Sequence, residues 1–429
     1  MRRHSGVGKT VLALTMAAAL AAVSACTKDA NTSSGTGSPT SVEVMSWWVG
    51  PGEADGLAAM IALFKQQNPG VEFVNATVAG GAGTNAKAQL ATRLAANNPP
   101  DSYQRHAGKE LAADIKAGDV EDLTYLYDQN GWKNLFPPGL IQAITDNGKI
   151  YSVPVNIHRS NLLWYLPKTL SDNGIAAPPQ SWDEFLTQAA AIQAKGKTAI
   201  SIGPAWTQKH LLENVLLGEL GVDKYNGLWN GSTDWTSAEV VTALNKYIKI
   251  LSYSDIKSAG ADWQPALDRV IEGSAVYNVM GDWANSYLAG TKKLAYKTGY
   301  DVTTAPGTAG VYNFLSDSFT LPVGAPHKAT AEKWLALCGS KEGQDAFNPL
   351  KGSIPARKDA DTSKYKDYLA TALADWTNPS TKVVGSLAHG VVANDAWNAE
   401  IDTALGLFIK DGDTSKFADT VQKKYTETK

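Results

Sequence analysis

The chain has 429 residues, a hydrophobic share of 44% and a formal net charge of −3. This length exceeds what one compact core usually supports, so we expect two or three folded units. The nearly balanced charge gives no indication of a nucleic-acid partner. Tryptophan and tyrosine, with 13 and 16 residues, outnumber the 9 phenylalanines. Their apolar faces and polar atoms suit partly wet binding clefts, although large α/β proteins also carry such residues for packing alone.

The first 25 residues show the three parts of a signal peptide. Basic residues from Arg2 to Lys9 precede a short apolar run over 11–23, which ends in Val23-Ser24-Ala25-Cys26. That run is too short to span a membrane. The ending resembles a bacterial lipobox, which implies that an acylated Cys26 is the first mature residue and anchors the protein outside the cytoplasmic membrane. The alternative is an ordinary signal peptide with a chance cysteine.

Residues 26–41 are rich in serine, threonine, glycine and asparagine, which predicts a flexible tether. Beyond it, the hydrophobic periodicity predicts strands over 42–45, 71–74, 150–155, 161–165, 300–302 and 319–323. Helical spacing predicts helices over 57–67, 84–96, 182–194, 210–220, 240–251, 329–347 and 395–409. The last but one of these helices carries Cys338, which we expect to be a buried, inert thiol.

The order strand, helix, strand, helix after residue 42 predicts a βαβ unit with a parallel sheet. Ligands of such sheets bind beyond the carboxyl ends of the strands. Trp47 and Trp48 follow the first strand directly. The sequence therefore places both tryptophans near a binding site, with burial in the core as the alternative.

Motifs for catalysis and cofactor binding are missing from the sequence. The glycines at 80, 81 and 83 precede a helix, but the lysine and hydroxyl residue of a phosphate-binding loop and the last glycine of a dinucleotide fingerprint are absent. There is no His-Glu-x-x-His, no cysteine pair at zinc spacing and no Gly-x-Ser-x-Gly. We expect no cofactor and no metal. A carboxylate pair of the glycosidase kind remains open, because such residues meet only in the fold.

Several segments resemble the extracellular solute-binding proteins of sugar ABC importers, and within that family the glucose/mannose-binding proteins. The specific parts are Ser46-Trp47-Trp48 and Gln104-Arg105-His106-Ala107-Gly108-Lys109, and the family-wide part is Pro178-Pro179-Gln180-Ser181-Trp182-Asp183-Glu184-Phe185. Met280-Gly281-Asp282-Trp283 and the stretch 315–319 add to the likeness. It covers nearly the whole chain after the tether.

The resemblance implies an α/β, two-lobed periplasmic-binding-protein fold of the type II kind, with a hinge and a sugar cleft between the lobes. We expect lobe one over 42–153 plus 301–350 and lobe two over 154–300 plus 351–429. His158 and Arg159 are interpreted as structural residues near the hinge, and Trp164, Trp182 and Trp334 as core.

The resemblance also implies which residues bind the sugar. An aromatic ring covers the apolar face of a hexose, and fixed polar groups bind its hydroxyls. Trp47 or Trp48 and the opposing Trp263 would supply the rings. The polar candidates are Glu53, Gln104, His106, Lys109, Asp317, Lys351 and His389. Each has an ordinary structural role as its alternative, and Glu53 is the weakest candidate because acids are common at helix starts.

These expectations describe a monomeric receptor, not an enzyme, that binds a monosaccharide such as glucose, galactose or mannose and delivers it to ABC permease subunits. A receptor for a disaccharide or short oligosaccharide is the first alternative. A secreted glycosidase is the second.

Overall fold

The computed structural model describes residues 41–80 and 83–428. The predicted signal peptide, Cys26 and nearly all of the predicted tether lie outside these residues. Ser41, the last residue assigned to the tether, already begins the first strand. Within the described ranges, no helix has the length and apolar character needed to cross a membrane.

The first sheet has five strands in the order β2-β1-β3-β13-β6. Their bounds are β2 (Glu72–Asn75), β1 (Ser41–Met45), β3 (Ser102–His106), β13 (Asp317–Thr320) and β6 (Val153–Pro154). β1 runs parallel to β2 and β3, which confirms the predicted βαβ unit. β13 is antiparallel to β3 and β6, so a strand from late in the chain lies between two strands from its first part.

Four helices accompany the first sheet: α1 (Glu53–Gln67), α2 (Thr84–Ala95), α12 (Lys328–Gly339) and α13 (Lys341–Lys351). α1 buries Leu57, Met60 and Phe64, at helical spacing, and ends at Asn68. The single helix predicted over 329–347 is wrong. Ser340 leaves the helical conformation and its hydroxyl accepts a hydrogen bond from Gly343 N at 2.9 Å, so it ends α12 and caps α13.

Short elements connect β3 to β6. They are a 3₁₀ turn (Lys109–Leu111), α3 (Ala112–Ala117), α4 (Thr124–Gln129), a second 3₁₀ turn (Trp132–Asn134), α5 (Pro138–Ala143) and the hairpin of β4 (Thr145–Asp146) and β5 (Lys149–Ile150).

The second sheet has four strands in the order β11-β8-β10-β9. They are β11 (Asp301–Thr304), β8 (Leu162–Tyr165), β10 (Ala275–Val279) and β9 (Thr198–Ile200). The helices α6 (Pro167–Asp172), α7 (Trp182–Ala194) and α10 (Gln264–Ile271) belong to this part of the chain. So do the short 3₁₀ turn (Ile256–Ser258), α11 (Trp283–Asn285) and the π-turn (Ser286–Thr291).

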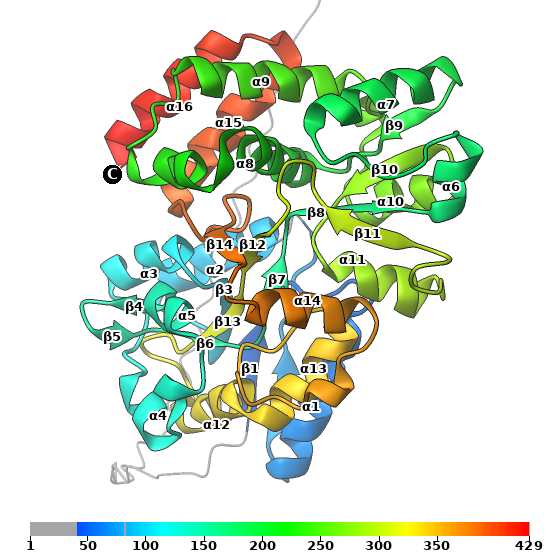
Figure 1. The fold of residues 1–429 in the computed structure, drawn as a ribbon. Helices are drawn as coiled ribbons and strands as arrows, with labels where there is room; N and C mark the ends of the chain where they lie inside the picture. The colour runs from blue at the N-terminus through cyan, green and yellow to red at the C-terminus, as the bar shows by residue number, and fades with distance from the viewer. Residues whose placement is uncertain (1–40, 81–82, 429) are drawn as a thin grey trace, which may run out of the picture. The chain divides into compact units, whose positions relative to one another are not determined.

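Four longer helices pack on one another beside the second sheet (Figure 1). They are α8 (Ala205–Asn230), α9 (Ala238–Leu251), α15 (Asp395–Asp411) and α16 (Thr414–Thr428). Their buried apolar residues, together with those of α7 and several of the second sheet, form a cluster separate from the larger cluster around the first sheet. Two cores agree with the expectation that one core is too few for this length.

A third, three-stranded sheet lies where the chain passes between the other two. Its order is β14-β12-β7, with β14 (Lys382–Gly385), β12 (Val311–Leu315) and β7 (His158–Arg159). β7 falls between β6 and β8 along the chain, and β12 between β11 and β13, so both crossings use this sheet. A 3₁₀ turn (Thr362–Lys364) and α14 (Tyr368–Thr377) precede β14.

The crossing points differ in detail from the expected lobe boundaries. β11 was expected in lobe one, but it pairs with β8 in the second sheet, so the return to the first sheet begins at β12 rather than at residue 301. The core assignments of Trp164, Trp182 and Trp334 are confirmed, since all three are fully buried. Cys338 is buried as well, and burial raises the pKa of its thiol well above the usual value.

Candidate functional site

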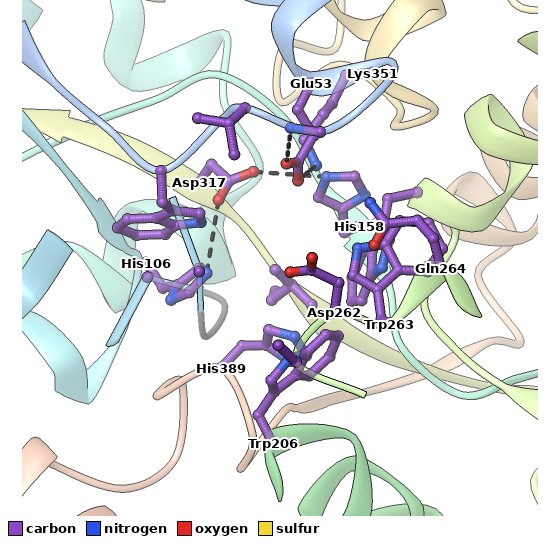
Figure 2. Close-up of a pocket in the computed structure, with 18 residues that line it drawn as sticks. Glu53, His106, His158, Trp206, Asp262, Trp263, Gln264, Asp317, Lys351 and His389 are labelled. Carbon is purple, nitrogen blue, oxygen red and sulfur yellow. Dashed lines mark hydrogen bonds and ion pairs between the residues drawn. The ribbon is translucent and has the colours of Figure 1, made fainter. Parts of the chain in front are cut away.

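A cavity of about 90 Å³ is lined by residues of the first and third sheets and by residues of the helices and loops that belong with the second (Figure 2). Its walls come from the loop after β1, the ends of β3, β12 and α13, the start of α8, β7, the loop before α10, α11, and the turn after β14. The lining residues are Trp47, Val49, Gly50, Glu53, Gly80, Gly83, His106, His158, Trp206, Ala261, Asp262, Trp263, Gln264, Trp283, Leu315, Asp317, Lys351 and His389.

The two adjacent tryptophans after β1 face different ways. Trp47 lines the cavity, and its ring lies 5.1 Å from that of His106. Trp48 is 1% exposed and packs between Phe319 and Phe347, at ring distances of 5.4 and 4.5 Å. Successive side chains of an extended segment point to opposite sides, so only Trp47 can offer a ring to a ligand in this cavity.

Gly83 makes room for the Trp47 ring. A Cβ atom on Gly83 would lie 2.8 Å from the indole, and the residue has a φ of +94°. Both features require glycine at this position. Gly83 therefore has a packing role here, unrelated to phosphate binding.

Asp317 accepts a hydrogen bond on each of its carboxylate oxygens. Its Oδ1 accepts from Gln104 Nε2 at 2.9 Å, and its Oδ2 accepts from Asn156 Nδ2 at 2.7 Å. His106 Nε2 lies 3.6 Å from Oδ1 and His158 Nε2 lies 3.5 Å from Oδ2. Burial alone would raise the pKa of Asp317, but the bond from His158 and the charge of Lys351 hold it well below the usual value.

Each of the two histidines beside Asp317 is held by a carboxylate on its far nitrogen. His106 Nδ1 lies 2.7 Å from Glu110 Oε2, and His158 Nδ1 contacts Asp282. An ionised carboxylate only accepts, so each Nδ1 carries a proton. Both imidazoles therefore turn their Nε2 atoms toward Asp317.

The carboxylates behind these histidines are buried. Burial would raise the pKa of Glu110, but Lys87, at 3.0 Å, and then His106 hold it well below the usual value. For His158, burial would lower the pKa, and the charge of Asp282 reverses the effect and raises it.

An ion pair closes another side of the cavity. Lys351 Nζ lies 3.0 Å from Glu53 Oε1 and 5.8 Å from the centre of the Trp283 ring. Glu53 is the first residue of α1 and Lys351 the last of α13, and the two helices pack together. The helix dipoles favour an acid at a helix start and a base at a helix end. Figure 2 shows this pair across the cavity from Trp206 and His389.

Aromatic rings and His389 form the remaining wall. His389 lies 5.2 Å from Trp283 and 6.0 Å from Trp206 between ring centres, and its Nδ1 is 2.8 Å from Ser386 Oγ. Trp263 precedes α10, and its ring lies 5.5 Å from that of Tyr287. Burial, and then the nearby His210 and His106, hold the pKa of His389 well below its usual value.

Most of the residues proposed from the sequence meet in this cavity. Trp47, Glu53, His106, Trp263, Asp317, Lys351 and His389 line it. Gln104 does not line the cavity but contacts two residues that do. Its Oε1 accepts a hydrogen bond from Trp47 N at 3.2 Å, and its Nε2 donates one to Asp317. Trp48 is core, and Lys109 is exposed and lines a different surface hollow. Lys109 is displaced because the chain turns into a 3₁₀ helix at that residue.

Several cavity residues were missing from the sequence proposal, among them Trp206, Trp283 and His158. Trp206 is the second residue of α8, and Trp283 lies two residues after Gly281, where a Cβ atom would lie 2.2 Å from the indole. His158 was interpreted as structural, yet it lies beside Asp317. The Met280-Gly281-Asp282-Trp283 motif was visible in the sequence, but nothing in it shows that the ring turns toward a ligand.

The arrangement can bind an uncharged polyol between aromatic rings, with Asp317 accepting and Lys351 donating hydrogen bonds. Across residues 41–80 and 83–428, no group of three or more histidine, cysteine, aspartate or glutamate side chains is placed to hold a metal ion.

Proteins of known sequence are similar to this one over most of its length. An uncharacterised ABC transporter extracellular-binding protein of Pyrococcus horikoshii is 32% identical over 392 residues, which cover 89% of this chain and 88% of the relative. A probable sugar-binding periplasmic protein of Brucella suis is 31% identical over 357 residues, 81% of this chain and 83% of the relative.

Solved structures share the fold. A chitin oligosaccharide binding protein superposes with a TM-score of 0.79 at 19% identity, covering 91% of this chain and 99% of the other. A bacterial solute receptor described as having an exclusive preference for β-D-galactopyranose superposes with a TM-score of 0.77 at 18% identity, covering 90% and 98%. These likenesses confirm the predicted two-lobed α/β fold.

The family described as bacterial extracellular solute-binding protein matches residues 41–345. This match and the relatives above cover well over half of the chain. The chain therefore belongs to the bacterial extracellular solute-binding proteins, which bind a solute outside the cytoplasm and are not enzymes.

Proposed function

We propose that the protein is the sugar receptor of a bacterial ABC importer and binds one monosaccharide in the cavity of Figure 2. The relatives support the class of ligand and transporter, since one is named as an ABC transporter extracellular-binding protein and another as a probable sugar-binding protein. The receptor acts as a monomer and passes its sugar to permease subunits in the membrane.

The observation that carries the proposal is the combination of aromatic faces with a fixed, ionised carboxylate. Trp47 and Trp263 offer rings for the apolar C–H faces of a pyranose. Asp317 keeps its charge because its pKa lies well below the usual value, and a carboxylate can accept from two hydroxyls. Glu53, His106, Lys351 and His389 complete the polar rim, and Gln104 holds Asp317 from behind.

The size of the cavity favours a monosaccharide. The cavity volume of about 90 Å³ is several times the roughly 10–15 Å³ that a cavity needs to admit one water. A single sugar ring with its hydroxyls suits this space better than a chain of rings. Glucose is the first candidate ligand, and its epimers galactose and mannose are the next. An oligosaccharide receptor is the second candidate, because one structural neighbour is named for chitin oligosaccharide.

Equilibrium dialysis with radiolabelled glucose, galactose and mannose tests the proposal. We expect saturable binding, and we expect Trp263→Ala to weaken all three sugars together because it removes stacking area. Trp376→Ala is the matched control, since Trp376 lies outside the cavity. The absence of saturable binding of any monosaccharide would overturn the proposal.

We also propose that Cys26 is acylated and anchors the protein to the outer face of the cell membrane, because Val23-Ser24-Ala25-Cys26 has the form of a lipobox. Detergent-phase partitioning should recover the wild type in the detergent phase and Cys26→Ser in the aqueous phase or as an unprocessed precursor. Equal partitioning of both mature proteins would refute the anchor.

A further inference from the structure

A carboxylate outside the cavity organises the turn that carries His389. Glu213 lies in the middle of α8 and is fully buried. Its Oε2 accepts hydrogen bonds from Leu387 N at 2.6 Å and Ala388 N at 3.0 Å. Its Oε1 accepts from Ser160 Oγ, beside β7, at 3.0 Å. One side chain of α8 thus fixes the backbone that leads into His389.

The same carboxylate determines how the hydroxyl of Ser386 is used. Ser386 Oγ lies 3.0 Å from both oxygens of Glu213 and 2.8 Å from His389 Nδ1. A serine hydroxyl has one proton to donate, and an ionised carboxylate can only accept. The hydroxyl proton therefore points to Glu213, and the serine oxygen is left to accept from His389.

This assignment fixes the tautomer of the imidazole. If Ser386 Oγ accepts, His389 must carry its proton on Nδ1. In a neutral imidazole the other nitrogen is then an acceptor. His389 is neutral near pH 7, because burial and the neighbouring His210 and His106 keep its pKa well below the usual value. His389 lines the cavity, so its free Nε2 is available to a ligand there.

We propose that Glu213 is a positioning residue which, through Ser386, holds His389 as the Nδ1–H tautomer, so that Nε2 accepts a hydrogen bond from a sugar hydroxyl. The ligand part of this inference rests on the proposed function. The inference also assigns a hydrogen-bonding role to each of three cavity side chains: His389 and Asp317 accept hydrogen bonds from the sugar, and Lys351 donates one. A sugar with fluorine or hydrogen in place of the hydroxyl facing His389 has nothing to donate there.

The tautomer is measured without any ligand. Long-range ¹H–¹⁵N NMR of protein labelled at histidine distinguishes protonated from unprotonated ring nitrogens, and the spectrum of His389→Gln identifies the His389 signals. We expect Nδ1 protonated and Nε2 unprotonated in the wild type. In Glu213→Gln the new amide can donate to Ser386, which frees the serine proton for His389 Nδ1 and moves the proton of the ring toward Nε2.

Two further variants keep the test decisive. Ser386→Ala removes only the linking hydroxyl and covers the case in which Glu213→Gln does not fold. Glu219→Gln makes the same substitution on the same helix, where Glu219 pairs with Lys246 at 2.7 Å, and should leave the His389 signals unchanged. A wild-type His389 protonated on Nε2, or one tautomer shared by wild type, Glu213→Gln and Ser386→Ala, overturns the proposal.

The binding measurement separates positioning from the proposed function. We expect Glu213→Gln and Ser386→Ala to weaken glucose binding about tenfold, the effect of one lost hydrogen bond, and Glu219→Gln to bind as the wild type does. Weaker binding with an unchanged tautomer would assign Glu213 a merely structural role and contradict the inference. If the wild type binds no monosaccharide but shows the expected tautomers, the positioning stands and the sugar assignment fails.

Discussion

Gln104 and Asp317, 213 positions apart in the chain, are joined by a hydrogen bond of 2.9 Å from Gln104 Nε2 to Asp317 Oδ1. The pairing of β3 with β13 brings them together, with Gln104 opposite Phe319 and Asp317 opposite His106. The other end of the same amide accepts from Trp47 N. Gln104 therefore links Trp47, in the aromatic wall of the cavity, to the carboxylate of Asp317.

The first prediction concerns that carboxylate. Asp317→Asn places an NH₂ group against one of the two donors, Gln104 or Asn156, and it removes the charge that would accept from sugar hydroxyls. Losing a hydrogen bond to a charged group costs roughly 1.5–3 kcal/mol, or about ten- to a hundredfold in affinity. The loss should differ among glucose, galactose and mannose, because epimers place their hydroxyls differently. Titration of the three sugars measures it.

Asp172→Asn, in an exposed pair with Lys168, is the control for Asp317→Asn and should bind as the wild type does. Wild-type affinity of Asp317→Asn for all three sugars would show that the polar rim lies elsewhere.

The second prediction separates the adjacent tryptophans. Trp48→Ala empties a core site between Phe319 and Phe347 and should lower the free energy of unfolding by about 3–5 kcal/mol. Trp47→Ala removes a cavity wall, so its larger effect should be on sugar affinity. Urea unfolding and sugar titration of both variants measure the two effects. A Trp48→Ala protein that keeps its stability but loses its sugar would reverse the assignment.

The third prediction is a pH dependence. His389 has a pKa well below its usual 6.5, from burial and then from His210 and His106, with Asp317 acting in the opposite direction. A sugar hydroxyl that donates to Nε2 requires the neutral ring, so protonation of His389 on acidification below about pH 6.5 should lower the affinity. Asp317 does not contribute to this pH dependence, because its own pKa is also held well below the usual value.

The free energy of unfolding should also decrease on acidification. The unfolded chain protonates His389 below about pH 6.5 while the folded chain resists, so the contribution of His389 to stability falls as pH decreases through that range. His389→Gln should therefore lose less stability than the wild type between neutral pH and about pH 5. Parallel stability profiles for the two proteins would show that His389 is not neutral in the fold.

The fourth prediction concerns Gly108, where the loop after β3 meets the turn after β14. Lys109 N donates to Val391 O at 3.1 Å, and Glu110 N donates to Gly390 O at 2.9 Å. A Cβ on Gly108 would lie 2.6 Å from Val391 O, so Gly108→Ala should push these segments apart and displace Glu110 behind His106. We expect weaker sugar binding and a lower unfolding midpoint.

Gly118→Ala is the matched control for Gly108→Ala, because Gly118 also has a positive φ, +77°, but has nothing within 4 Å of its Cβ position. It should show only the backbone strain, about 1–2 kcal/mol, and unchanged affinity. Equal effects of both substitutions on binding would mean that the contact at Val391 is irrelevant to the site.

Local patterns predicted the fold well where a short segment determines its own structure. The helix predicted over 182–194 has those bounds in the structure, and the strands after 42, 71 and 161 lie within one residue of the expected positions. The helix break at Ser340 follows from a capping hydroxyl inside a continuous apolar period. The strand predicted over 319–323 is also displaced and spans Asp317–Thr320. Sequence alone did not predict that β13 would enter the first sheet between β3 and β6, since both pairings are long-range.

Many of the residues that line the cavity could be proposed from the sequence, but the directions of their side chains could not. Asp317, Lys351 and His389 were proposed, and the structure places them in one cavity. Trp47 and Trp48 could not be separated, because the side that each faces depends on the backbone after β1. Lys109 was proposed for the cavity, but it points away from it. Glu213 was not proposed at all, because its partners at 386–388 are more than 170 residues away.

Calorimetric titration of the protein with glucose, galactose, mannose, maltose and a chitin oligosaccharide tests the central claim most directly. The account predicts one saturable site per chain for at least one of the three monosaccharides, bound more tightly than maltose or the chitin oligosaccharide. Binding of an oligosaccharide with no measurable binding of any monosaccharide would contradict it.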